Sequence, residues 1–269
     1  MNNSILPFWK PIGTSSSIIA KRVAEKLNCK TSHTGTLDPL AEGVVVVIVG
    51  DESAFKENFI SEFKTYEFGF IFGFSTDTHD ALGLIENINS EEIYLTEEQV
   101  IEELNTFIGS YKQKYPEFSS KKVLGKSLWE YKRLGLEVPE VFIDGTIREV
   151  DVLDFSEISS TNVLNHIKHQ INQIRGNFRQ EEILKKYQES NFPEKFYELK
   201  VRIQMSRGLY VRGLARDLSE KLNSNCIILD LIRVKDGEIE KKDCLDVNEY
   251  FKEEILKDQN FLFPEFKKL

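Results

Sequence analysis

The sequence has few cysteines and no long apolar run. Its three cysteines, Cys29, Cys226 and Cys244, are odd in number, far apart and without the spacing of metal ligands. We therefore expect reduced thiols in a cytoplasmic protein, not a disulfide framework or a zinc site. The longest apolar run, Val44–Val49, is far shorter than the roughly 20 residues that span a membrane. Residues 1–10 lack the basic and apolar regions of a secretory signal, so none is predicted.

An excess of positive charge is also missing. The net charge of -9 disfavours non-specific binding to nucleic acid. Positive charge is nevertheless concentrated in two stretches, residues 121–133 and 200–216, while acidic residues gather around 86–103 and after 236. Such a chain could bind RNA on one face, or these charges could belong to ordinary solvated helices and strands, and composition leaves both interpretations open.

The 269 residues suffice for one large domain or two smaller ones, and they contain no internal repeat. Apolar alternation and β-branched runs predict strands at 44–49, 66–74, 147–155, 199–205 and 227–234. Helical spacing and capping residues predict helices at 15–27, 96–108, 127–135, 208–222 and 246–255. Residues 28–38 are predicted to be a loop.

These elements predict an α+β fold with a mixed, largely antiparallel sheet, because the βαβ rhythm of a parallel sheet is absent. Residues 156–192 differ from their surroundings, since they are polar with helical spacing. Leu164, Ile167, Ile171 and Ile174 would share one face there. We expect a helical insertion between two strands.

The string His33–Gly43, HTGTLDPLAEG, places the carboxylate of Asp38 in a loop beside a proline and between two glycines. Asp38 could be a nucleophile held outside regular structure. It could equally be an Asx-turn acceptor or the N-cap of a short helix starting at Pro39. His33 by itself is more often a surface or packing residue than a functional one.

The string resembles the catalytic motif of TruB-type pseudouridine synthases. Other segments resemble further motifs of that family, in family order: Lys10–Ser16, Lys64–Tyr66, Gly73–Gly83, Phe118–Lys122 with Gly125 and Tyr131, Ser206–Leu218, and Leu231–Arg233 with Gly237. The matches run from Trp9 to about Ile239, apart from residues 156–192. The resemblance implies a pseudouridine synthase fold that isomerises a uridine at T-arm position 55 of tRNA, as a monomer without cofactor or metal.

The same resemblance assigns catalytic roles. It implies that Asp38 is the essential carboxylate, which attacks C1′, adds to C6 or removes a sugar proton; the sequence leaves these routes open. Arg212 matches the arginine that pairs with this aspartate, and its alternative is a surface or phosphate-contacting residue. Tyr66 matches the tyrosine that stacks on the target base, and its alternative is one more aromatic in a Phe-rich strand.

Substrate-binding roles follow in the same way. Tyr210 and Leu231 match residues that line the uracil pocket. His33 matches the histidine that fills the space left when the uridine is flipped out of its stack. Asp80 matches an aspartate of an RNA-contacting loop. The candidates for phosphate contact are Lys10, Lys122, Lys126 and Arg207.

The chain departs from the family pattern at several positions, none of them Asp38, Tyr66 or Arg212. Ser32, Glu42, Ser53-Ala54, Ser75 and Tyr115 replace the usual residues. We expect one catalytic domain over residues 1–245 and a short helical tail over 246–269, without the C-terminal PUA RNA-binding domain that bacterial members usually carry. The insertion 156–192 is hypothesised to contribute RNA contacts in place of that domain; its alternative is a helical decoration packed on the sheet.

Three rival functions are considered. A relative that modifies other RNAs within a guide-RNA complex is disfavoured, because such complexes usually hold the guide through the PUA domain. A non-catalytic protein that binds RNA or folds tRNA is disfavoured by the intact Asp38, Tyr66 and Arg212. A hydrolase with the paired carboxylates Asp77 and Asp80 is remote, since no metal-ligand histidine pair is nearby.

Overall fold

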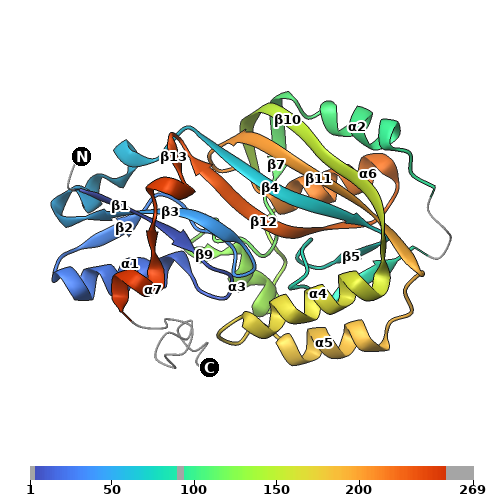
Figure 1. Ribbon diagram of the computed structural model, residues 1–269, viewed down its shortest axis with the longest axis horizontal. Helices are drawn as coiled ribbons and strands as arrows, with labels where there is room; N and C mark the ends of the chain where they lie inside the picture. Colours follow the sequence, from blue (N-terminus) through green and yellow to red (C-terminus); the bar gives the residue numbers. More distant parts are fainter. Residues whose placement is uncertain (1–3, 90–93, 253–269) are drawn as a thin grey trace. The chain divides into compact units, whose positions relative to one another are not determined.

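The computed structural model describes residues 4–89 and 94–252, which form two compact units. Unit 1 comprises residues 4–67, 165–180 and 230–252, and unit 2 comprises residues 68–89, 94–164 and 181–229. Four elements contribute residues to both units: β4 (Phe63–Phe72), α4 (Ser160–Gln173), α5 (Gln180–Glu189) and β12 (Cys226–Asp236). The elements are labelled in Figure 1. The predicted α+β class is confirmed.

Unit 1 contains a mixed sheet with the strand order β14-β1-β3-β12, in which β2 also pairs with β3 and β13 with β12. Its other strands are β1 (Ile5–Lys10), β2 (Thr31–His33), β3 (Glu42–Val49), β13 (Ile239–Glu240) and β14 (Leu245–Asp246). β1 runs antiparallel to β3, whereas β12 runs parallel to it. In this register Gly43 lies opposite Lys10 on one side and Arg233 on the other. The strand that follows the Asp38 loop is therefore flanked by two basic residues.

Two helices of unit 1, α1 (Ser16–Leu27) and α7 (Val247–Phe251), begin at the predicted capping residues Ser15 and Asp246. Its two 3₁₀ segments, η1 (Gly50–Phe59) and η2 (Lys241–Asp243), were not predicted. The Ser15 hydroxyl caps α1 by accepting the N–H of Ile18 at 3.1 Å, and α1 buries Ile19 and Val23. The prediction of a continuous loop over 28–38 is wrong, because residues 31–33 pair with β3 as β2. Ile255, predicted in the last helix, lies outside the described residues.

Unit 2 contains a sheet in which β10 pairs antiparallel with both β11 and β7. Its strands include β5 (Phe74–Thr76), β6 (Ile85–Ile88), β7 (Gly109–Lys114), β8 (Lys122–Val123), β9 (Lys126–Ser127), β10 (Phe142–Ser159) and β11 (Lys195–Ser206). Strands β10 and β11 form a long antiparallel pair (Figure 1), although α4 and α5 separate them in sequence. The helices are α2 (Glu97–Asn105), α3 (Leu128–Arg133) and α6 (Val211–Leu222). Both predicted capping boxes, Thr96 with Gln99 and Ser127 with Glu130, are present.

Three predicted boundaries in these regions need correction. The strand predicted over 66–74 ends at Phe72, and Phe74 begins the separate strand β5. The helix predicted to reach Ile108 ends at Asn105. The insertion predicted from Ser156 begins with strand, because residues 156–159 still belong to β10 and pair with β11. Helices α4 and α5 follow, with Ile167, Ile171 and Ile174 buried as predicted.

None of the helices in the described residues is long and apolar enough to cross a membrane. Cys29, Cys226 and Cys244 form no disulfide with one another. Burial raises the pKa of the Cys226 thiol to about 12, so this group stays protonated. Within residues 4–89 and 94–252, no cluster of three or more His, Cys, Asp or Glu side chains has the arrangement of a metal site.

Candidate active site

The loop of Asp38 is fixed by backbone hydrogen bonds on both sides of the aspartate. The N–H of Leu37 donates to the Ser16 hydroxyl at 3.0 Å. The carbonyl of Pro39 accepts the N–H of Gly13 at 3.0 Å, and the carbonyl of Asp38 accepts that of Ala41 at 3.0 Å. The half-buried Asp38 side chain thus projects from irregular backbone whose position is determined by its neighbours.

Lys10 supports the same loop from β1. It is fully buried, and its ammonium donates to the carbonyls of Pro11, at 3.1 Å, and Ala41. Burial lowers the pKa of Lys10 to about 7, although the negative charge of Asp38 acts in the opposite direction. This placement does not support the predicted phosphate contact, because the ammonium faces the loop and not solvent. The motif Lys10–Ser16 instead supports the loop. Lys10, Gly13 and Ser16 each form a hydrogen bond with a peptide group of the Asp38 loop.

A buried charged cluster lies beside the start of this loop. The Arg233 guanidinium donates to the carbonyl of Val44 at 2.7 Å and to that of Gly35 at 3.1 Å. The Lys64 ammonium lies 2.5 Å from the carboxylate of Asp236, which also accepts the Thr34 hydroxyl at 2.9 Å. Burial alone would raise the pKa of Asp236. The positive charges of Arg233 and Lys64, with the hydrogen bonds, outweigh it and hold that pKa below its usual range.

The final glycine of the catalytic motif is required by this cluster. Gly43 has φ +121°, and a Cβ atom there would lie 2.3 Å from the carbonyl oxygen of Arg233. Any side chain would therefore force β3 away from β12 and disturb Arg233.

Tyr66 follows Lys64 on β4 and is half-buried. Burial raises the pKa of its hydroxyl, and Arg233 opposes this while Asp236 and Asp38 add to it. The phenol therefore stays protonated at neutral pH. The charge of Asp38 is thus among those that act on the Tyr66 hydroxyl.

Two more predicted site residues belong to unit 1. His33 ends β2, and its Nε2 lies 3.4 Å from the Ser17 hydroxyl. Burial lowers the pKa of His33, and the positive charge of Arg233 lowers it further, so the imidazole is neutral at neutral pH. Leu231 is buried on β12, two residues before Arg233. Unit 1 therefore holds Asp38 and four of the other predicted site residues: Lys10, His33, Tyr66 and Leu231.

The other predicted site residues belong to unit 2. Arg212 is the second residue of α6 and is buried. Its guanidinium donates to the carbonyls of Thr78 at 3.3 Å and Phe118 at 3.2 Å, and lies 3.6 Å from the Asp80 carboxylate. Asp80 also accepts the Thr78 hydroxyl at 2.6 Å and the N–H of Leu82 at 2.9 Å. Because Asp38 lies in unit 1, its pairing with Arg212 stays a prediction.

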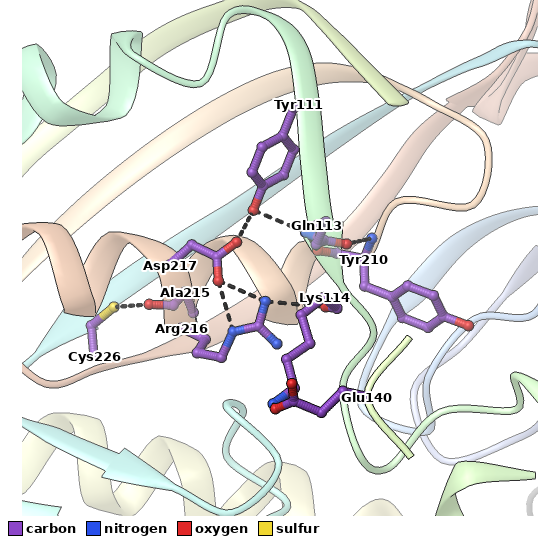
Figure 2. Close-up of polar contacts among 9 residues, drawn as sticks. All are labelled: Tyr111, Gln113, Lys114, Glu140, Tyr210, Ala215, Arg216, Asp217 and Cys226. Carbon is purple, nitrogen blue, oxygen red and sulfur yellow. Dashed lines mark hydrogen bonds and ion pairs between the residues drawn. The ribbon is translucent and has the colours of Figure 1, made fainter. Parts of the chain in front are cut away.

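Tyr210, the N-cap residue of α6, is held by a side chain from β7 (Figure 2). The fully buried Gln113 accepts the backbone N–H of Tyr210 at 2.7 Å and donates to its carbonyl at 2.9 Å. Figure 2 also shows the Tyr111 hydroxyl donating to Asp217, whose other oxygen pairs with Arg216 at 2.6 Å. This network fixes the helix start that presents both Tyr210 and Arg212.

The remaining phosphate candidates are exposed. Lys122 and Lys126 lie on the β8–β9 hairpin, and Arg207 lies between β11 and α6. Their exposure agrees with a contact to a polyanion, whereas Lys10 is buried.

Comparison with known proteins now decides the family. Residues 21–178, more than half of the chain, match the family model "TruB family pseudouridylate synthase (N terminal domain)". The chain belongs to the TruB family. Two relatives with the name tRNA pseudouridine synthase B come from Bacillus cereus (33% identical over 89% of this chain and 68% of that protein) and Aquifex aeolicus (30% over 91% and 72%). A third, from Listeria monocytogenes, is 30% identical over 97% of this chain and 75% of that protein.

Solved structures agree with this TruB assignment at the level of the fold. A chain in the crystal structure of a Cbf5-Nop10-Gar1 complex superposes with a TM-score of 0.56 at 15% identity. A chain in the structure of an H/ACA RNP bound to a substrate RNA containing 2′-deoxyuridine gives 0.53 at 15% identity. This chain covers 56% and 53% of those chains, so it spans little more than half of their length.

Sequence reasoning gave no role to several residues that hold this TruB site together. Lys64 and Arg233 were recognised as parts of motifs, but their buried partners Asp236 and Val44 are distant in sequence. Gln113 was not singled out at all. Its strand has the sequence GSYKQK, so a polar residue there is not distinctive and the local sequence gave no signal.

Proposed function

We propose that this protein converts uridine to pseudouridine at T-arm position 55 of tRNA, with Asp38 as the essential carboxylate. The observation that carries the proposal is the Asp38 loop, which Lys10, Gly13 and Ser16 hold through its backbone while the carboxylate itself stays half-buried. The names of the TruB relatives support tRNA as the substrate.

The reaction needs no net redox change. The bond between C1′ and N1 breaks, the base turns, a bond forms between C1′ and C5, the C5 proton leaves and N1 gains a proton. Asp38 acts by one of three routes: attack on C1′, addition to C6, or removal of the C2′ proton to form a glycal. Each route requires an ionised carboxylate next to the flipped nucleotide.

The other site residues receive the roles that the family resemblance implies. Tyr66 stacks on the uracil with its hydroxyl near Asp38. Leu231 and Tyr210 line the pocket, and neutral His33 occupies the space left by the flipped base. Arg212 pairs with Asp38, and Asp80 orients Arg212 in addition to facing the RNA. Lys122, Lys126 and Arg207 contact phosphates.

Release of tritium from C5-labelled uridine in a T-arm tRNA tests this proposal. Wild type should release tritium and Asp38→Asn should not, while both bind the tRNA. Equal release from the two proteins would remove Asp38 from the mechanism. Binding without release from either would favour a non-catalytic RNA-binding protein, and activity on other RNAs alone would refute the tRNA assignment.

A further inference from the structure

The segment from His166 in α4 to Arg175, just after the helix, makes two contacts within unit 1, and each contact adjoins a residue of the proposed site. The contacts come from residues 165–180, which belong to unit 1 together with Asp38 and Leu231. Neither contact uses the basic side chains on which an RNA-binding role would depend.

The first contact is a clamp on Asp230 in β12. The Nε2 atom of His166 lies 2.7 Å from the carboxylate oxygen of Asp230, and the buried Gln170 donates to the same oxygen at 2.6 Å. Asp230 has φ +54°, a left-handed conformation that is uncommon within a strand. Two hydrogen bonds to its side chain stabilise this conformation. The next residue is Leu231, so the direction in which Leu231 leaves the backbone depends on the clamp.

The second contact reaches the Asp38 loop through one intervening residue. The N–H of Arg175 donates to the carbonyl of Gly13 at 3.3 Å, and the N–H of Gly13 donates to the carbonyl of Pro39 at 3.0 Å. Gly13 has φ +88°, and a Cβ atom there would lie 2.2 Å from the carbonyl oxygen of Gln173. The end of α4 is therefore in close contact with the segment that holds the peptide following Asp38.

We propose that α4 is a positioning element of the active site: His166 and Gln170 position Leu231 through Asp230, and the backbone of residues 173–175 positions the Asp38 loop through Gly13. The inference rests on the proposed function. It gives the insertion a role in positioning other residues of the protein. An RNA-binding role would instead depend on its exposed lysines, Lys168, Lys185 and Lys186.

The test compares the double variant His166→Ala/Gln170→Ala with Asn172→Ala, an exposed residue on the same helix. We expect kcat for tRNA to fall about tenfold or more in the double variant, because misplacement of a site residue by about 1 Å slows a positioned reaction. The Kd for tRNA should stay near the wild-type value. If the double variant folds poorly, Gln170→Glu replaces it in the test. This change keeps the shape of the side chain but places a second carboxylate against that of Asp230, so it should also lower kcat.

Asp230→Gly provides the coupling test, because glycine adopts positive φ without a clamp. In that background the His166 and Gln170 changes should cause little further loss of kcat. The proposal would be overturned if the His166 and Gln170 changes lowered kcat as much in the Asp230→Gly background as in wild type. Wild-type kcat in His166→Ala/Gln170→Ala would overturn it as well. Raised Kd in Lys185→Ala/Lys186→Ala, with normal kcat in the clamp variant, would assign the insertion to RNA contact instead.

Hydrogen exchange separates a failure of this inference from a failure of the proposed function. Peptides that contain Leu231 and Asp38 should exchange faster in the double variant than in wild type, whether or not the protein acts on tRNA. If wild type shows no tritium release, the proposed function fails. The exchange rates of these peptides still decide whether the segment has the positioning role. Unchanged exchange would contradict it.

Discussion

At the scale of single residues, the charged cluster of Lys64, Asp236 and Arg233 is the feature with the largest energetic consequence. Lys64 and Asp236 are both buried, and Thr34 and Arg233 bring the start of the Asp38 loop into the same cluster. Buried pairs add little stability over apolar replacements, but removing one partner leaves an uncompensated charge. The cluster therefore makes the loop sensitive to any single change of charge.

Asp236→Asn should lower the free energy of unfolding by about 3–5 kcal/mol, because it leaves the Lys64 ammonium buried without its counter-charge. Chemical denaturation measures this value. The double variant Lys64→Met/Asp236→Leu should lose less than Asp236→Asn alone. A double variant that loses the sum of both single changes would show that the two side chains do not interact.

Lys10 gives a pH-dependent stability. Its pKa is about 7 in the folded chain, against an ordinary value of 10.5. As the pH falls from about 10 to about 7, the unfolded chain takes up a proton that the folded chain does not, so the folded state loses stability over this window. Below about pH 7 both states are protonated and the loss stops.

The stability of wild type relative to Lys10→Met should therefore rise with pH from about 7 to about 10. Urea denaturation of both proteins at a series of pH values measures the difference. Parallel pH profiles for the two proteins would contradict the assigned pKa.

At the scale of elements, the start of α1 has two serines with separate tasks. Ser15 caps the helix, whereas Ser16 accepts the N–H of Leu37 in the Asp38 loop. Ser16→Ala should lower kcat about tenfold, because Asp38 loses one of its backbone restraints. Ser15→Ala should cost about 1 kcal/mol of stability with nearly normal kcat. Steady-state kinetics and thermal melting separate the two effects, and the same kcat in both variants would refute the distinction.

The start of α6 depends on Gln113 in a comparable way. Gln113→Leu removes the acceptor of the Tyr210 N–H, which should cost about 1–3 kcal/mol, whereas the Tyr210 carbonyl keeps the N–H groups of Gly213 and Leu214. Because Tyr210 and Arg212 begin the same helix, kcat/KM should fall as well. Wild-type stability and kcat/KM in Gln113→Leu would contradict this role.

Predictability from sequence differed between local and long-range features. The capping signals of Ser15, Thr96 and Ser127 located the starts of three helices correctly, because a cap is set by neighbouring residues. The strand at 31–33 was missed because its pairing with β3 stabilises a segment whose own composition favours a loop. The bend after Phe72 was missed because the aromatic alternation continues through Gly73 to Phe74.

At the scale of the whole molecule, the family motifs suggested the candidate site residues but not the residues that support them. Asp38 and Tyr66 were located by resemblance, and their common membership of unit 1 agrees with it. Lys10 was expected to meet phosphate, yet it is buried beneath the loop, since burial depends on strands β1 and β3 meeting in register. The clamp of α4 on Asp230 joins segments more than sixty residues apart, and no local pattern indicates it.

Mapping of pseudouridine at single-nucleotide resolution tests the central claim most directly. An unmodified tRNA would be incubated with wild type or Asp38→Asn and every uridine examined by carbodiimide labelling and primer extension. The account predicts one new pseudouridine, at T-arm position 55, with wild type and none with Asp38→Asn. Modification at other positions only, or an unchanged product from Asp38→Asn, would contradict it.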